Sequence, residues 1–109
     1  MKEIAWQGSS REDLIGFPVE ARRMAGYQLD KVQHGELPDD WKPMPAIGVG
    51  VREIRIRESS GIYRVIYVTT IGCTIHVLHA FQKKTQRTRQ SDVELARQRF
   101  RNIESEHRD

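Results

Sequence analysis

The stretch GVREIRIRESSGIYRVIYVTTIGCTIHVLHAFQKK, residues 50–84, predicts the central sheet of this protein. It contains three runs rich in β-branched and aromatic residues, which favour strands. These runs are residues 49–57, 62–71 and 74–81. Gly and Ser in the intervening segments indicate short reversals, at 58–61 and at 72–73. Because consecutive strands joined by short reversals pair antiparallel, we predict an antiparallel sheet.

Positive charge is concentrated in and beside this predicted sheet. Between residues 52 and 89, Arg and Lys outnumber the two acidic residues, Glu53 and Glu58. Alternation along the first strand places Glu53, Arg55 and Arg57 on one face. A local basic excess favours a phosphate-rich partner, and a merely solvated basic face is the alternative. The formal net charge of the whole chain is +3.

The second and third predicted strands carry apolar side chains on both faces. In the third strand, alternation predicts Val77, His79 and Phe81 on one face and Leu78 and Ala80 on the other. Two apolar faces indicate that helices cover much of the sheet. The charged positions are therefore expected towards one end of the sheet or on an uncovered patch.

Residues N-terminal to the sheet predict an edge strand followed by a helical hairpin. The edge strand is KEIAW, residues 2–6. Ser10 with Asp13 predicts the start of a short helix that ends near residues 16–17. Pro18 suits the first turn of a second helix, and Gly35 suits its end. The expected apolar stripe is Phe17, Ala21, Met24, Ala25, Leu29 and Val32.

Two further segments complete the predicted organisation. Residues 36–45, ELPDDWKPMP, contain three prolines and predict an extended connection anchored by Trp41 and Met44, either functional or a packed cover. After a basic segment, Ser91 predicts the start of a last helix. Its expected apolar stripe is Val93, Ala96, Phe100 and Ile103. A chain of 109 residues is expected to form a single α+β domain, 1–109.

Composition excludes several classes of protein. The single cysteine, Cys73, rules out an intrachain disulfide and a cysteine-based zinc site, which suits a reducing compartment. His76 and His79 have no third ligand nearby, so we predict neither a metal nor a cofactor. No apolar run is long enough to span a membrane and no secretory signal precedes the domain, so a cytoplasmic location is expected.

Five ordered segments carry a resemblance to a known family. They are W-x-G-S-S-R-E-D-L at 6–14 with Phe17-Pro18, K-P-M-P at 42–45, G-x-G-V-x-E-I-R at 48–55, Y-R-V-I-Y at 63–67, and V-L-H-A-F-Q-K-K-T at 77–85. In this order and spacing, the chain resembles the RelE/HigB superfamily of toxins from bacterial toxin–antitoxin systems, in particular its phage-related HigB-like branch.

The resemblance implies a RelE-like fold with an N-terminal strand, a helical hairpin, a curved antiparallel sheet and a C-terminal helix. It implies an mRNA interferase, a metal-independent endoribonuclease that cleaves translated mRNA in the ribosomal A site. It also implies neutralisation by a helix-turn-helix antitoxin of the HigA-like kind. Two alternatives remain: a non-catalytic nucleic-acid- or protein-binding module of phage origin, and a degenerate member that survives only as the partner of its antitoxin.

Metal-independent RNA cleavage needs groups that position the 2′-hydroxyl, remove its proton, stabilise negative charge and protonate the leaving oxygen. Arg55 and Arg64 are the expected phosphate and transition-state clamps, because a guanidinium contacts two phosphate oxygens and stays charged. Glu53 is a candidate base, with a structural ion pair to Arg55 or Arg64 as the alternative. His79 is a candidate for acid–base work or a core residue.

The remaining candidates concern RNA binding. Lys83 and Lys84 are expected to contact the scissile phosphate and ribosomal RNA, with an exposed basic turn as the alternative. Tyr67 is a candidate for stacking on an unpaired base, or for core packing. Further cations are expected to give salt-sensitive affinity for ribosomal RNA without sequence specificity, with a solvated face as the alternative. These are Arg87, Arg89, Arg97 and Arg101, and Arg52 and Arg57 are additional RNA-binding candidates.

Overall fold

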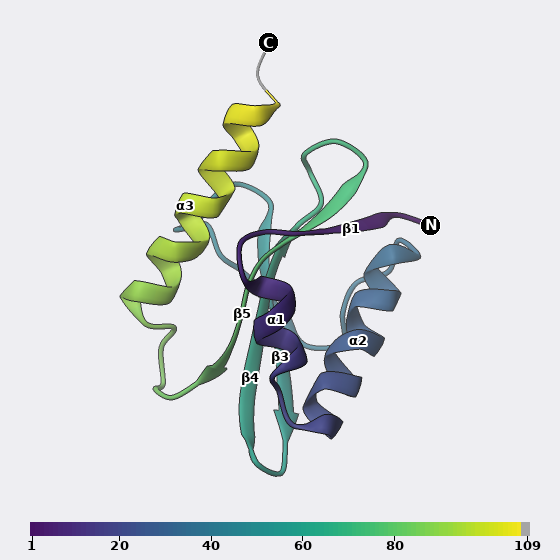
Figure 1. Ribbon diagram of the computed structural model, residues 1–109, viewed down its shortest axis with the longest axis vertical. Coiled ribbons are helices and arrows are strands. Elements are labelled where there is room, and N and C mark those ends of the chain that lie inside the picture. Colours follow the sequence, from purple (N-terminus) through teal and green to yellow (C-terminus); the bar gives the residue numbers. More distant parts are fainter. Residues whose placement is uncertain (108–109) are drawn as a thin grey trace.

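The structure, a computed structural model, describes residues 1–107. Within these residues one five-stranded sheet has the order β1-β5-β4-β3-β2 (Figure 1). Its strands are β1 (Glu3–Trp6), β2 (Trp41–Pro43), β3 (Val51–Glu58), β4 (Gly61–Val68) and β5 (Thr74–Lys83). The helices are α1 (Ser10–Ile15), α2 (Val19–Gln33) and α3 (Gln90–Glu106). The predicted α+β class, with an N-terminal strand, a curved sheet and a C-terminal helix, is confirmed.

The predicted antiparallel pairing of the three central strands is confirmed, and a parallel N-terminal strand makes the whole sheet mixed. Strand β1 pairs parallel to β5, while the β2–β3, β3–β4 and β4–β5 pairs are antiparallel. The chain also forms an edge strand, β2, inside the segment predicted to be only an extended connection. Pro43 fits there because an edge strand leaves one row of backbone groups without sheet partners.

Two helical layers bury opposite faces of the sheet. Helices α1 and α2 cover one face, as Figure 1 shows, and α3 packs on the other. The α2 side buries Leu14, Phe17, Ala21, Ala25, Leu29 and Val32 against Ile54, Ile56, Tyr63, Val65 and Tyr67. The α3 side buries Val93, Ala96, Phe100 and Ile103 against Val51, Ile66, Val68 and Leu78. The predicted apolar stripe of the last helix is therefore confirmed.

One residue of the predicted α2 stripe is not in the core. Met24 is 39% exposed, while Ala21 and Ala25 are fully buried. Met24 fits the spacing of three or four residues, but its position around the helix lies at the edge of the contact with the sheet.

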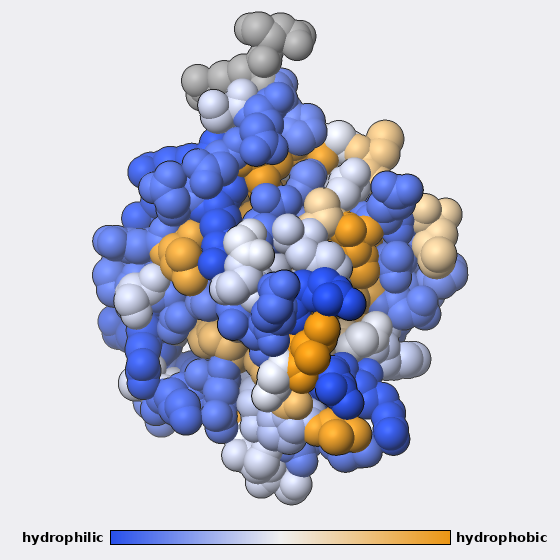
Figure 2. All heavy atoms as spheres, in the orientation of Figure 1, coloured by the Kyte–Doolittle hydropathy of each residue, from blue (hydrophilic) through white to orange (hydrophobic). Residues whose placement is uncertain are grey.

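On the face of the molecule seen in Figure 2, hydrophobic side chains are scattered among hydrophilic ones.

The predicted alternation along β5 fails at Leu78. Ile66 pairs with His79, but the next residue of β4, Tyr67, pairs with Val77, so Leu78 is a bulge without a partner in β4. The bulge puts Val77 and Ala80 together in the α2-side core. His79 and Phe81 remain on one face, and Leu78 joins them on the α3 side. A periodicity of two cannot predict such an inserted residue.

Among residues 1–107, no helix combines the length and the apolar character needed to cross a membrane.

Candidate functional site

The α3 face of the sheet is covered at only one end. Helix α3 packs on Val51, Val68 and Leu78, and the β3–β4 hairpin extends away from it (Figure 1). At the hairpin end, Arg55 of β3 pairs in register with Arg64 of β4. Directly paired residues share a face, so charged side chains from neighbouring strands converge there. We call this group the basic cluster: Lys42, Glu53, Arg55, Arg57, Arg64 and Lys83.

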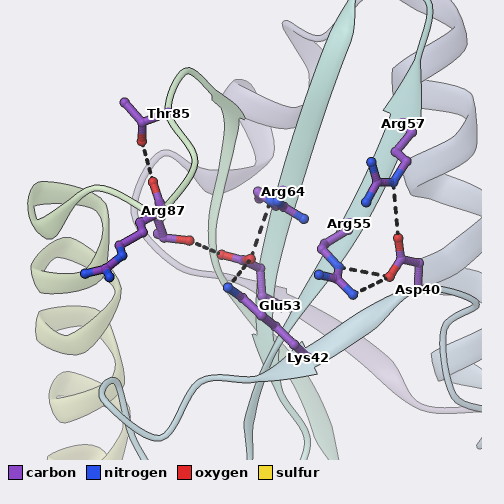
Figure 3. Close-up of polar contacts among 9 residues, drawn as sticks. Asp40, Lys42, Glu53, Arg55, Arg57, Arg64, Thr85 and Arg87 are labelled. Carbon is purple, nitrogen blue, oxygen red and sulfur yellow. Dashed lines mark hydrogen bonds and ion pairs between the residues drawn. The ribbon is translucent and has the colours of Figure 1, made fainter.

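Glu53 lies at the centre of the basic cluster and is completely buried. Its Oε1 lies 3.5 Å from Arg64 Nε and 3.8 Å from Lys42 Nζ (Figure 3). Its Oε2 accepts a hydrogen bond of 2.8 Å from the Thr88 hydroxyl. A buried carboxylate persists only when charged or hydrogen-bonding partners surround it. Of the two ion pairs predicted from the sequence, the structure contains the one with Arg64.

Arg64 is also buried, with 3% of its surface exposed. Its Nε and Nη1 atoms have no hydrogen-bond partner within residues 1–107. Burial lowers the pKa of the guanidinium, with the nearby Arg55 and Arg57 adding to this effect and Glu53 opposing it. Buried donors without acceptors are costly. The side chain is therefore suited to receive an anionic oxygen.

Arg55 and Arg57 share a different carboxylate. Asp40, in the connection before β2, accepts hydrogen bonds at Oδ1 from Arg55 Nε, at 2.9 Å, and lies 2.8 Å from Arg55 Nη2. Its Oδ2 lies 3.6 Å from Arg57 Nε (Figure 3). The cations of the cluster thus face two carboxylates, the buried Glu53 within the cluster and the partly exposed Asp40 beside it.

Sequence reasoning missed Asp40 and Lys42. Both lie in the proline-rich connection, more than ten residues from the strand residues that they contact. The sequence held one usable signal, since charged residues at 39, 40 and 42 stand between prolines in a segment with few other polar groups. Pairing of β2 with β3 brings Lys42 opposite Glu53.

Lys83 closes the cluster at the end of β5. It pairs in register with Ile62 and lines a shallow pocket of about 470 Å³ with Lys84 and Thr85. Partial burial lowers the pKa of its ammonium group, and the positive charges of Arg64 and Lys42 lower it further. Lys84 is exposed beside it. Of the two predicted lysines, Lys83 therefore belongs to the cluster and Lys84 lies at its margin.

His79 lies outside the basic cluster. Its Nε2 is 2.7 Å from Asp92 Oδ1 of α3, and its ring stacks on Phe81 at 4.7 Å between centroids. Ile66 lies between His79 and Glu53 in the sheet register. With 6% of its surface exposed, His79 matches the core alternative, although its Nδ1 has no hydrogen-bond partner among the described residues.

The other candidate RNA contacts are dispersed. Tyr67 is fully buried in the α2-side core, which also matches the core alternative. Arg52 stacks over the Trp41 ring at 4.8 Å, beside the cluster rather than in it. Arg87 and Arg89 are exposed in the segment between β5 and α3, which Thr88 ties to Glu53.

The described residues, 1–107, contain no group of three His, Cys, Asp or Glu side chains arranged to hold a metal ion. The chemistry that the cluster offers is that of fixed cations around one partly accessible surface. Such a surface binds a polyanion and stabilises negative charge that develops on it.

The fold and the basic cluster define the class: a small α+β protein with a curved sheet and a cationic face. The sequence model of the family described as "Phage derived protein Gp49-like (DUF891)" matches residues 12–101, a range that includes every member of the cluster. The chain belongs to this family of phage-derived, toxin-like modules, which is part of the RelE/HigB-like toxin superfamily. No curated protein matches the chain.

Family membership confirms the predicted superfamily, while the HigB-like branch stays a prediction. A toxin-like module also suggests an antitoxin as its partner.

Proposed function

We propose that this protein is the toxin of a toxin–antitoxin pair and acts as an mRNA interferase, an endoribonuclease that cuts translated mRNA in the ribosomal A site. The observation that carries the proposal is the buried Arg64, whose Nη1 has no hydrogen-bond partner within residues 1–107, set among Arg55, Arg57 and Lys83. Four cations gathered at one end of a sheet face fit an RNA backbone better than a small neutral ligand.

Cleavage starts when the 2′-hydroxyl attacks the adjacent phosphorus and ends when the 5′-oxygen leaves. Arg64 and Arg55 contact the phosphate and stabilise the extra negative charge of the transition state. Glu53 positions Arg64 rather than removing a proton, because its carboxylate is buried and shared by three partners. Lys83 is the best candidate for taking the proton of the 2′-hydroxyl, because its lowered pKa favours the neutral amine, and the leaving 5′-oxygen takes a proton from water.

The exposed Lys84, Arg87 and Arg89 contact ribosomal RNA in this proposal. They are exposed in the segment that follows Lys83, so they extend the cationic surface beyond the scissile phosphate. A helix-turn-helix antitoxin of the HigA-like kind, as the resemblance implies, neutralises the protein.

Induction of the protein in a bacterial host tests this function. We expect growth arrest, with new mRNA 5′ ends inside translated regions. Arg55→Ala, which changes a partly exposed residue, and the double variant Arg55→Ala/Arg64→Ala should each relieve the arrest. Arg23→Ala is the matched control, since Arg23 is exposed on α2 and forms an ion pair with Glu20, away from the basic cluster. Arrest that persists in a folded double variant would remove the two arginines from the mechanism.

A non-catalytic binding module of phage origin is the second candidate. The pairing of Glu53 and His79 with structural partners favours it, because neither of these predicted proton-transfer groups is free. It predicts RNA binding by the purified protein without cleavage products on programmed ribosomes.

A further inference from the structure

Asp40 holds the two outer arginines of the basic cluster in the geometry of a bound oxyanion. One carboxylate oxygen is 2.9 Å from Arg55 Nε and 2.8 Å from Arg55 Nη2, so it faces two donors along one edge of the guanidinium. The other oxygen is 3.6 Å from Arg57 Nε. Guanidinium groups bind carboxylates and phosphates with the same planar arrangement of donors. The position of the Asp40 carboxylate therefore marks a site that a phosphate group fits.

The backbone fixes Asp40 at this place. The Arg55 N–H donates to the Asp40 carbonyl at 2.8 Å. The preceding residue, Asp39, accepts from Lys31 Nζ at 2.5 Å and from Gln28 Nε2 at 2.8 Å, and its own N–H donates to Gln28 Oε1 at 2.8 Å. These bonds fasten the 39–40 turn to α2. These hydrogen bonds therefore hold Asp40 beside the two arginines.

The side chains that meet at Asp40 remain accessible. Arg55 is 31% exposed, Arg57 is 67% exposed and Asp40 is 37% exposed. Ion pairs at this exposure contribute little stability, so a competing anion can replace the carboxylate without unfolding the turn. Arg55 also lies directly opposite Arg64 in the sheet. A phosphate at the Arg55–Arg57 pair would therefore be a neighbour of one held by Arg64.

We propose that Arg55 and Arg57 form a subsite for a phosphate flanking the one at Arg64 in single-stranded RNA, with Arg55 bridging the two phosphates, and that Asp40 is the internal counter-anion that the flanking phosphate displaces. The choice of RNA as the ligand rests on the proposed function. The carboxylate keeps the two arginines neutralised and oriented in the free protein. Binding of RNA exchanges the Asp40 contact for a phosphodiester contact, which lowers the affinity for isolated RNA.

Binding of a 2′-O-methyl oligouridylate to the full chain at low salt tests the proposal. This probe lacks the 2′-hydroxyl nucleophile, so its binding is independent of cleavage. Asp40→Asn preserves the shape of the side chain and removes its charge, and we expect it to tighten binding about threefold to fivefold, the scale of an exposed ion pair. Asp30→Asn, which removes a more exposed carboxylate from α2 (60% exposed, against 37% for Asp40), should change the affinity less than twofold.

A double-variant cycle separates competition at the arginines from a general effect of charge. In an Arg55→Ala background, the increase in binding affinity caused by Asp40→Asn should fall to less than half of the increase measured with Arg55 present. An equal gain with and without Arg55, an unchanged or weaker affinity for Asp40→Asn, or no binding by any variant would overturn the proposal. A gain that depends on Arg55, found together with a failure to cleave on ribosomes, would overturn the enzymatic function and leave the subsite standing.

Discussion

Glu53 is the residue on which the order of the basic cluster depends. Its buried carboxylate faces Arg64 and Lys42 and accepts from Thr88. Removal of one partner from a buried ion pair leaves the other charge uncompensated, which costs about 3–5 kcal/mol. We expect Glu53→Gln to lower the free energy of unfolding by an amount in this range, measured by urea denaturation.

The double variant Glu53→Gln/Arg64→Met provides the control for this prediction. It removes both charges, so its loss of stability should be smaller than the sum of the two single losses. Additive losses would show that the two side chains do not stabilise each other.

Lys83 gives a second prediction at the residue scale, this one on pH. Its pKa is lowered in the folded protein from the ordinary 10.5, first by burial and then by Arg64 and Lys42. Between the folded and unfolded pKa values the unfolded chain binds more protons, so stability rises with pH through this window. Below the folded pKa the full penalty of the charged ammonium applies.

We therefore expect Lys83→Gln to be more stable than the unchanged protein at pH 7, with a difference that shrinks as the pH approaches 10.5. Unfolding midpoints measured from pH 7 to pH 10.5 provide the check. Lys84→Gln is the control, because Lys84 is exposed beside the cluster. A constant difference across the range would show that Lys83 titrates alike in both states.

At the scale of elements, a side-chain hydrogen bond links the 84–89 segment to the basic cluster. The Thr88 hydroxyl donates to Glu53 at 2.8 Å, across 35 positions of sequence. A hydrogen bond to a charged group contributes roughly 1.5–3 kcal/mol. We expect Thr88→Val to loosen the segment, so that trypsin cleaves faster after Lys84, Arg87 and Arg89, each an exposed residue.

Thr85→Val is the matched control for that experiment, because the Thr85 hydroxyl donates to the Arg87 carbonyl within the same segment. Equal cleavage rates in the two variants would mean that the Glu53 contact does not hold the segment in place.

The elements also show where sequence reasoning succeeded and where it stopped. Alternation placed Glu53, Arg55 and Arg57 on one face because β3 pairs regularly along its whole length. It failed on β5 because Leu78 is a bulge, and a single inserted residue reverses the faces on one side of it. The bulge is stabilised from a distance, since Arg99 of α3 donates to the Leu78 carbonyl at 2.8 Å. Local patterns do not contain that contact.

The candidate site could be predicted only in part for a similar reason. Arg55 and Arg64 are visible as cations on predicted strands and Lys83 as a cation just after one, so composition and position in the sequence suffice to find them. Asp40 and Lys42 become part of the site only when β2 pairs with β3, and an edge strand of three residues leaves little signal in a proline-rich segment. Glu53 likewise accepts a hydrogen bond from Thr88, which lies in the segment after β5, so its environment depends on a residue distant in the sequence.

At the scale of the whole molecule, the two faces of the sheet differ in how far the helices cover them. Helices α1 and α2 bury one face along Ile54, Ile56, Tyr63 and Val65, which makes a rigid support. Helix α3 buries only part of the other face and leaves the hairpin end to the basic cluster. A net charge of only +3 understates this arrangement, because most of the acidic residues lie elsewhere. The distribution of charge, rather than its total, should govern RNA binding.

Salt dependence measures that distribution directly. Each phosphate neutralised on a single strand contributes about −0.7 to the slope of log K against log salt concentration. If four cations each neutralise a phosphate, the slope for a 2′-O-methyl oligouridylate should be about −3 by this rule. The four are Arg55, Arg57, Arg64 and Lys83. Arg57→Gln, which changes the most exposed of the three arginines, should make the slope shallower by about 0.7. Arg23→Gln on α2 should leave it unchanged. A slope close to zero, or equal losses for Arg57→Gln and Arg23→Gln, would place RNA binding on a surface other than the basic cluster.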